Sequence, residues 1–219
     1  MKKQIRSITL QDGIYQELVD AIVTGRIEPG SKLTVASLAK QFDVSIMPVR
    51  EALMRMEATA FITIERNRRI TVSELTSENL KNILEARLLN ERYSAEKASL
   101  QRSDESIKRL EEILEDIAHA QRIEDYLKAN RYFHNTIYGQ ACVPVIYEFI
   151  KSLEVRMSPY LHILFRERQD WNAPEWRRNH EGMLEGMKRK NPELICKWLE
   201  VDLKTAAGLV NNMIENRRA

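Results

Sequence analysis

The apolar residues in the first third of the chain recur first at helical spacing and then at strand spacing. Apolar positions three and four residues apart predict a helix over 10–24, a short helix after Thr34 and a third helix after Ser45. The segments 61–64 and 70–72 are rich in β-branched and aromatic residues, and the polar stretch 65–69 separates them. They predict the two strands of a hairpin. Three helices followed by a hairpin is the order of elements in a winged helix-turn-helix.

The chain from about residue 78 onwards carries only helical periods. Helices are expected over 78–100, 104–121, 124–141, 144–168, 175–190 and 192–216. Pro144, Pro174 and Pro192 fall near the starts of three of these helices, where a missing backbone N–H is tolerated. Residues 72–77 resemble a linker. The fold class predicted is therefore mostly α, with a winged helix-turn-helix over 1–75 and an all-helical bundle over 76–219.

Composition excludes some classes of protein and favours others. The chain has 219 residues, of which 43% are hydrophobic and 30% charged, which suits a helix-rich soluble protein with a sizeable core. No apolar run approaches the ~20 residues of a membrane span, and the N-terminus lacks the apolar stretch of a signal peptide. We therefore expect a cytoplasmic protein without a membrane partner. Cys142 and Cys196 have no paired spacing and are expected to be reduced thiols.

The net charge of +2 is too small to indicate a nucleic-acid partner by itself, but its placement is more informative. Residues 1–75 hold 11 Lys/Arg and 9 Asp/Glu, so the excess lies entirely in the predicted winged helix-turn-helix. The arginines of this part gather on the third helix and in the hairpin turn, at positions 50, 55, 66, 68 and 69. A local basic patch steers a polyanion better than a diffuse excess does.

The third helix has the features of a recognition helix that enters the major groove of DNA. Ser45 and the backbone amides of its first turn suit a phosphate, and Arg50 is placed to bind a guanine edge with two hydrogen bonds. Ile46 and Met47 are exposed beside them. Arg66, Arg68 and Arg69 lie where a wing would touch the DNA backbone or minor groove. For each arginine alone, a solvated surface position is the alternative interpretation.

The sequence also resembles the GntR superfamily of bacterial regulators, in the branch with an all-helical FCD domain. The segment 21–33 is similar to the opening of that family, and Val44-Ser45 with Pro48-Val49-Arg50-Glu51-Ala52-Leu53 is the most specific similarity. Further landmarks are Glu85-Ala86-Arg87, Phe133-His134 and Asn179-His180-Glu181. The resemblance covers nearly the whole chain and implies a DNA-binding head joined to a helical sensor domain.

This chain departs from the family pattern at the recognition helix and the wing. The family usually has Arg-Thr after the serine, where this chain has Ile46-Met47, whose apolar side chains could instead contact thymine methyl groups. Glycines that are frequent before the wing and at its tip are replaced by Ala60 and Arg69. We therefore expect an unusual operator preference and a differently shaped wing tip.

The resemblance implies a metal site formed by Asn130, His134, His180 and Asp202. Asn130 and His134 are four residues apart and share a helix face, while His180 and Asp202 come from the last two helices. The family usually has one aspartate and three histidines, whereas this set has two imidazoles, one carboxylate and one amide oxygen. It suits Zn²⁺, Ni²⁺ or Mn²⁺ with a position open for a ligand carboxylate. A metal-free cluster of hydrogen-bonded core histidines is the alternative.

The resemblance also suggests an effector pocket lined by Arg87 and Glu91, with Arg156 as a further candidate because a guanidinium binds a carboxylate through two bonds. An ordinary helix salt bridge between Arg87 and Glu91 is the alternative. Aromatic side chains are candidates for the pocket wall or for simple core: Tyr132, Tyr160, Trp171 and Trp176. His119 and His162 are expected to be surface or core residues.

The expected function is sequence-specific, non-enzymatic regulation of transcription, with repression favoured over activation. A homodimer would bind a palindromic double-stranded operator, and a small-molecule carboxylate in the helical domain would change the spacing of its two DNA-binding heads. Two other classes stay open: a metal-dependent hydrolase with Asp202 or Glu181 as base, and a scaffold protein that senses no ligand. The absence of an HExxH motif or a nucleophile–base pair speaks against the hydrolase.

Overall fold

The computed structural model describes residues 9–66, 69–74, 76–169 and 173–216. The chain divides into two compact units, residues 1–74 and 75–219, beside the boundary expected after residue 75. Each unit is described by itself. Within the described residues, no helix is both long enough and apolar enough to cross a membrane.

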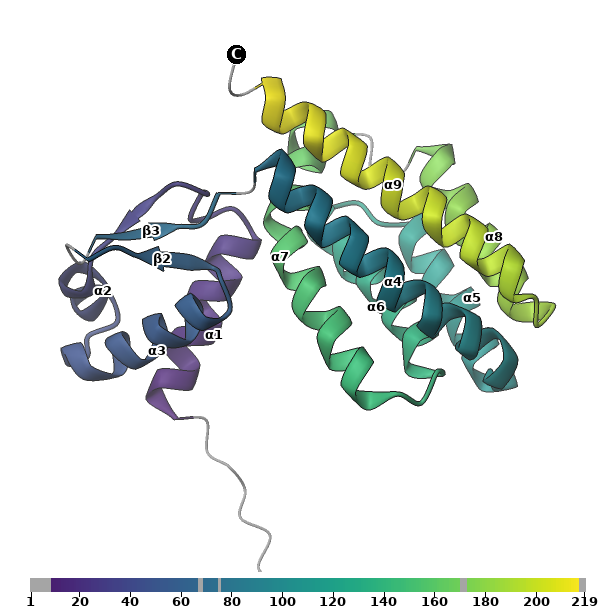
Figure 1. Ribbon diagram of the computed structural model, residues 1–219, viewed down its shortest axis with the longest axis horizontal. Helices are drawn as coiled ribbons and strands as arrows, with labels where there is room; N and C mark the ends of the chain where they lie inside the picture. Colours follow the sequence, from purple (N-terminus) through teal and green to yellow (C-terminus); the bar gives the residue numbers. More distant parts are fainter. Residues whose placement is uncertain (1–8, 67–68, 75, 170–172, 217–219) are drawn as a thin grey trace, which may run out of the picture. The chain divides into compact units, whose positions relative to one another are not determined.

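Among its described residues, the first unit contains three helices and a small sheet (Figure 1). The helices are α1 (Leu10–Val23), α2 (Val35–Gln41) and α3 (Ile46–Ala58), and the strands are β1 (Lys32–Leu33), β2 (Ile62–Ile64) and β3 (Ile70–Val72). The predicted helices and hairpin are confirmed. The sequence prediction missed β1, a two-residue strand that is too short to show a period and pairs antiparallel with β3. The strand order is therefore β1-β3-β2.

Local chemistry fixes where the helices of the first unit begin. The hydroxyl of Thr9 accepts a hydrogen bond from the amide of Asp12, and the carboxylate of Asp12 accepts one from the Thr9 amide. At the start of α2, the hydroxyl of Thr34 accepts from the amide of Ser37. The buried stripe of α3 packs against α1 and leaves the opposite side of α3 exposed. That stripe consists of Val49, Ala52, Leu53 and Met56.

The second unit is entirely helical among its described residues, as predicted. Its helices are α4 (Ser77–Gln101), α5 (Asp104–Ala118), α6 (Ile123–Gly139), α7 (Pro144–Arg168), α8 (Pro174–Lys188) and α9 (Pro192–Asn216). The three prolines expected near helix starts are the first residues of α7, α8 and α9. The long helices α4 and α9 lie side by side, and α8 packs against α9 (Figure 1).

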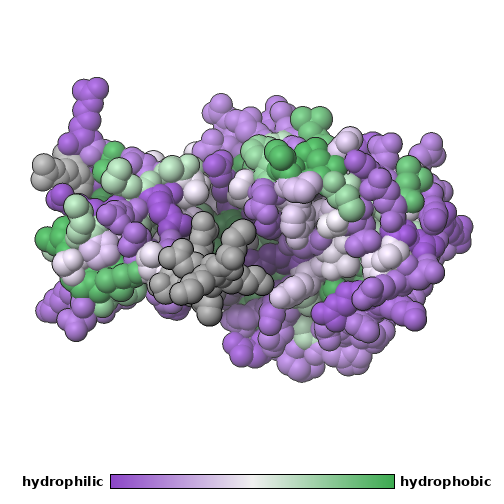
Figure 2. All heavy atoms as spheres, turned by 90° about the horizontal axis from the view of Figure 1, so that it is seen from below, coloured by the Kyte–Doolittle hydropathy of each residue, from purple (hydrophilic) through white to green (hydrophobic). Residues whose placement is uncertain are grey.

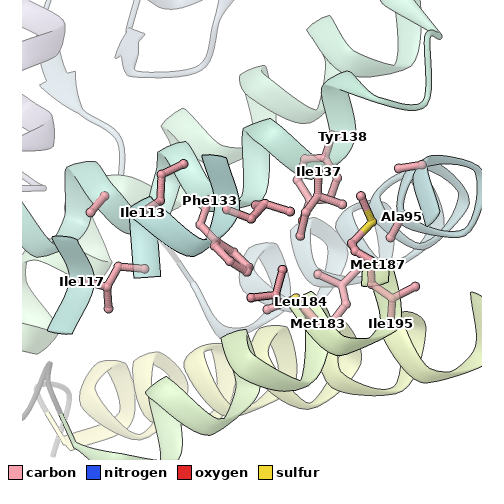
Figure 3. Packing of buried hydrophobic residues seen from close by; sticks show 14 of the residues in the cluster. Ala95, Ile113, Ile117, Phe133, Ile137, Tyr138, Met183, Leu184, Met187 and Ile195 are labelled. Carbon is pink, nitrogen blue, oxygen red and sulfur yellow. The ribbon is translucent and has the colours of Figure 1, made fainter. Parts of the chain in front are cut away.

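The core of this unit surrounds Phe133 of α6, which is fully buried (Figure 3). Apolar residues of α5 and α8 pack around it, including Ile113, Ile117, Met183 and Leu184. Polar side chains are also buried in the bundle: Arg87, Glu91, His134, Asn179, His180 and Asp202. Because burying a charge is costly unless it is paired or binds a metal, these residues mark the interior position of a site.

Two glycines test how tightly the bundle is packed. A Cβ at Gly186 of α8 would lie 2.6 Å from the backbone nitrogen of Ile195, whereas a Cβ at Gly208 of α9 would meet nothing within 4 Å. We expect Gly186→Ala to lower the free energy of unfolding by about 1–3 kcal/mol through overpacking. Gly208→Ala should raise it by roughly 0.5–1 kcal/mol, because alanine loses less backbone entropy. Urea unfolding of the two variants gives both values, and equal changes would contradict the packing described.

Candidate functional site

The first turn of α3 is exposed and built for contact with an anion. Ser45 is the N-cap residue of α3, as predicted, but its side chain makes no capping hydrogen bond. Pro48 has no amide N–H, and the amides of Ile46 and Met47 have no acceptor within the helix itself. These two amides lie at the positive end of the helix dipole, where an anion is favoured. Arg50 lies one turn further along and is exposed.

Ile46 and Met47 expose large apolar side chains beside this polar group. Hydrophilic residues predominate on the face of the molecule in Figure 2, where the hydrophobic residues form scattered patches. Ile46 is 50% exposed and Met47 65% exposed. A partner that docks on α3 would therefore bury apolar surface of both side chains, which favours binding.

The hairpin formed by β2 and β3 is the expected wing. The amide of Glu65 donates to the carbonyl of Arg69 over 2.9 Å and closes the base of the turn. Arg66 and Arg69 are both exposed. Arg68 lies outside the described residues. The wing thus presents basic side chains on the same unit as α3.

Three of the four predicted metal ligands come together inside the helical unit. His134 of α6, His180 of α8 and Asp202 of α9 are all buried, and one ligand atom from each lies within 4.8 Å of the others. Asn130 joins them, because its Oδ1 is 2.8 Å from Nε2 of His180. Three helices therefore bring the expected set to one point.

The contacts of His180 leave its Nε2 available as a ligand atom. Nδ1 of His180 is 2.8 Å from the carbonyl oxygen of Trp176, which only accepts, so Nδ1 carries the proton. In the neutral ring Nε2 then has a lone pair, which faces the Asn130 oxygen. A cation that binds both atoms would satisfy this contact, and so would the other orientation of the Asn130 amide, in which Nδ2 donates to Nε2. A backbone carbonyl that fixes the other ring nitrogen is also the usual partner of a metal-binding histidine.

His134 is oriented by the same arrangement. The hydroxyl of Tyr138 donates to Oε2 of Glu91 over 2.5 Å, so its oxygen accepts from Nδ1 of His134 at 3.1 Å. The remaining ring nitrogen, Nε2, lies 3.4 Å from Oδ2 of Asp202. Both histidines therefore direct Nε2 towards Asp202 and Asn130, and the donor set fits a borderline divalent ion such as Zn²⁺ or Ni²⁺.

The pKa values of His180 and Asp202 agree with that role. Burial lowers the pKa of His180 to about 4, so its ring is neutral and can ligate. Burial opposes ionisation of Asp202, but His134, His180 and Asn179 outweigh it and lower the pKa of Asp202 to about 2. Burial likewise disfavours protonated His134, yet the Asp202 carboxylate raises the pKa of His134 above its ordinary value. Asp202 therefore favours the protonated ring of His134, and a metal that binds His134 would have to displace that proton.

Arg87 and Glu91 form a buried ion pair next to the metal set. Nε and Nη2 of Arg87 donate to the two carboxylate oxygens of Glu91 at 2.5 and 3.3 Å. Burial works against the charge of Arg87, but Glu91 prevails and raises the pKa of Arg87. Arg156 of α7 is partly exposed and makes no hydrogen bond or ion pair among the described residues, so the structure does not join it to this pair.

The other candidates lie apart from the metal set. His119 is exposed, and His162 is buried with Glu124 at 3.8 Å. Tyr132 lines a hollow of about 500 Å³ between α5 and α6, while Trp176 and Tyr160 pack in the core. Trp171 lies outside the described residues.

Sequence reasoning gave no site role to three residues that contact the site or a neighbour of it. Tyr138 lies four residues after His134, so its helical spacing could have revealed it. Asn179 donates to Oδ1 of Asp202 over 3.3 Å. Glu154 of α7 accepts a hydrogen bond from Asn135, and no local sequence pattern predicts this, because α7 packs against α6 only in the folded bundle.

Comparison with protein families covers both units. Residues 10–72 match the family model of bacterial regulatory proteins of the gntR family, and residues 82–204 match the FCD domain. The chain belongs to the GntR family. The GntR helix-turn-helix implies DNA binding, and the FCD domain implies binding of a small-molecule effector. The two sites described here thus occur in the two parts that define this branch of the GntR family.

Similar proteins include GntR-family transcriptional regulators. The HTH-type transcriptional regulator McbR of Escherichia coli is 30% identical over 85% of this chain and 85% of its own length. The gluconate operon transcriptional repressor of Bacillus licheniformis is 27% identical, over 90% of this chain and 83% of its own. The solved structure of E. coli McbR/YncC aligns with a TM-score of 0.82 at 27% identity, covering 94% of this chain and 99% of that one.

Proposed function

We propose that this GntR-family protein is a repressor that binds a palindromic operator as a homodimer through α3 and the wing. The exposed first turn of α3 supports this most strongly, because it combines Ser45, amides without a helical acceptor and Arg50 on a helix that packs against α1. Ser45 and the amides would bind phosphate, Arg50 a guanine edge, and Arg66, Arg68 and Arg69 the backbone near the wing. Ile46 and Met47 would lie against the bases.

Selection of binding sequences from a random DNA pool by the full-length protein tests this proposal. A shared palindromic sequence should emerge, because two identical heads related by a twofold axis read two identical half-sites. Sedimentation of the complex should give two chains per duplex. Selected pools with no common sequence would reject the proposed specificity.

Ile46 and Met47 give a further prediction about that sequence. If they contact thymine methyl groups, replacing those thymines by deoxyuracil should weaken binding about fourfold for each methyl, at about 0.8 kcal/mol per buried carbon. For the Met47→Ala variant, the difference in affinity between the thymine and deoxyuracil duplexes should be smaller, because the contacts of Met47 with thymine methyl groups are lost. Comparing the two proteins on the two duplexes forms a double-mutant cycle. Filter-binding titrations on both duplexes supply the four affinities. Equal affinity for thymine and deoxyuracil duplexes would contradict the contact.

We further propose that the helical unit senses a small-molecule carboxylate through a divalent metal. The metal would be held by Asn130, His134, His180 and Asp202 and would act as a Lewis acid for one carboxylate oxygen of the effector. Arg87, Glu91 and Arg156 are proposed to line the effector site. An effector that binds one of two dimer geometries more tightly would favour that geometry and so change the affinity for the operator. The coupling free energy is reciprocal, so the operator would change the affinity for the effector by the same factor.

Metal analysis of the purified protein, followed by thermal shifts with a panel of carboxylates, tests the proposed sensor. Two curated relatives are gluconate operon repressors, which supports including gluconate in the panel. A stabilising acid should also change the operator affinity. Stabilisation without any change in operator affinity would reject the coupling between the two units.

A further inference from the structure

The two arginines of α3 have different surroundings. The guanidinium of Arg55 forms an ion pair with the carboxylate of Asp12 on α1 and lies 4.3 Å from the ring centroid of Tyr15. Arg50 makes no hydrogen bond or ion pair among the described residues. The two arginines are five residues apart and therefore point about 140° apart around the helix. The Arg55 side of α3 is thus occupied by α1, and the Arg50 side is left for a partner.

Met54 lies on this free side of α3. It follows Arg50 by four residues and Met47 by seven, so the three side chains share one face of the helix. Seven residues are nearly two full turns, and the direction of the side chain drifts by only about 20° over them. Met54 is 66% exposed, as much as Met47. The outer row of α3, formed by Met47, Arg50 and Met54, therefore has one cation between two apolar side chains.

The length of the outer row matches a short stretch of DNA. Met47 and Met54 are about 10 Å apart along the helix axis, at 1.5 Å per residue, which is about three base-pair steps of 3.4 Å. A recognition helix lies in the major groove, so the two methionines can face base pairs on either side of the one bound by Arg50. The row ends one turn later at Glu57 and Ala58, which are exposed. A carboxylate is repelled by phosphate, and the alanine side chain is short.

The chemistry of the major groove restricts what Met54 can recognise there. The apolar group that a base pair presents in this groove is the C5-methyl of thymine. 5-Methylcytosine carries the same methyl group at the same ring position. Methionine is unbranched and polarisable and adapts to such a group. An apolar side chain in continuity with the DNA-binding first turn of α3 therefore suits a pyrimidine with a C5-methyl group.

We propose that Met54 is a further specificity-determining residue, which contacts the C5-methyl group of a pyrimidine beyond the guanine bound by Arg50. This inference rests on the proposed DNA recognition by α3 and extends it from the first turn of the helix by about two turns. Each half-site then has methyl-bearing pyrimidines on both sides of the guanine, about three base pairs apart. The methyl group belongs to thymine or to 5-methylcytosine.

Duplexes that differ only in methyl groups test the contact. The guanine is located first, as the position whose substitution weakens binding by the wild-type protein but not by Arg50→Ala. Each pyrimidine within about three base pairs of it is then compared in two pairs, thymine with deoxyuracil and 5-methylcytosine with cytosine. Filter-binding titrations of the full-length protein give the affinities. A methyl effect in the thymine pair alone identifies thymine, and an effect in both pairs shows that the site also responds to cytosine methylation.

The Met54→Ala variant assigns the methyl effect to its residue. Loss of the methyl that Met54 contacts should weaken binding by the wild-type protein about fourfold per half-site, or roughly 16-fold for a palindrome. Met54→Ala should bind both members of that pair equally and keep the effect at the position read by Met47. Met54→Leu keeps an apolar side chain and should keep both effects. Val145→Ala, which shortens an exposed apolar side chain of α7, is the control and should also keep both.

The results separate this inference from the function on which it rests. If the wild-type and Met54→Ala proteins show equal methyl effects at every tested position, the assignment to Met54 is wrong, while their shared operator preference leaves the proposed function intact. Loss of the effect in Val145→Ala would likewise overturn the assignment. If selection from random DNA yields no operator, the proposed function fails and this inference fails with it.

Discussion

The Arg50→Ala variant is expected to lose its preference for the operator while the protein stays folded and dimeric. Arg50 is exposed on α3 one turn from Ser45, and a bidentate contact with guanine contributes about 1–3 kcal/mol of discrimination, or roughly 5- to 150-fold. Because two heads bind each operator, the loss applies to both half-sites. Competition of operator and random duplexes in a gel-shift assay measures the ratio directly.

Two comparisons separate base recognition from general attraction to DNA. Arg109 is an exposed arginine of α5, so Arg109→Ala removes the same charge from the helical unit and should keep the operator preference. Arg66→Ala should weaken operator and random DNA alike, since a phosphate contact carries no sequence information. Retained operator preference in the Arg50→Ala protein would reject the role given to Arg50.

The His180→Ala variant is expected to lose bound metal. His180 supplies Nε2, with its other nitrogen fixed by the carbonyl of Trp176, so its removal leaves one imidazole, one carboxylate and one amide oxygen. We expect metal content after Ni²⁺ loading and desalting to fall from about one ion per chain to less than about 0.1, since a site with a single nitrogen ligand suits this ion poorly. Mass spectrometry of the metal, with circular dichroism as a check on folding, gives the result.

Two further variants are expected to affect metal binding less than His180→Ala does. Tyr138→Phe removes the hydroxyl that orients His134 and should weaken Ni²⁺ binding by roughly 10- to 100-fold, as loss of an outer-shell partner does. His119→Ala removes an exposed histidine of the chain and should leave metal content unchanged. Equal metal content in the His180→Ala and His119→Ala proteins would show that any bound ion lies elsewhere.

The elements of the fold were predictable because each follows from a local pattern. The stripe of α3, the hairpin and the first-turn prolines of α7, α8 and α9 are all visible within short windows of sequence. The strand β1 was not predictable from the sequence, because two residues are too few to show a period. Lys32 and Leu33 form a strand only by pairing with β3. Its register depends on tertiary contact, which single-sequence patterns do not contain.

The candidate sites show the same division between local and long-range information. Arg50 was predicted as a DNA contact from its place on the third helix, and spacing predicted the ion pair of Arg87 and Glu91. The resemblance suggested the effector pocket and the metal set Asn130, His134, His180 and Asp202. The contact of Glu154 with Asn135 escaped both approaches, since it arises from the packing of α7 against α6. Spacing also predicts the ion pair of Arg87 with Glu91, but only the structure shows that the pair is buried and that Arg87 donates to both carboxylate oxygens of Glu91.

Sequence-specific binding of DNA by the first unit is the central claim, and one competition assay tests it most directly. The full-length protein is mixed with a labelled duplex from upstream of its own gene and an excess of random duplex at about 0.15 M salt, where nonspecific dissociation constants are roughly 10⁻⁴–10⁻⁶ M. The account predicts that the upstream duplex stays bound at nanomolar protein and that an unlabelled copy of it, but not random DNA, displaces it. Displacement by random DNA at the same concentration would contradict the account.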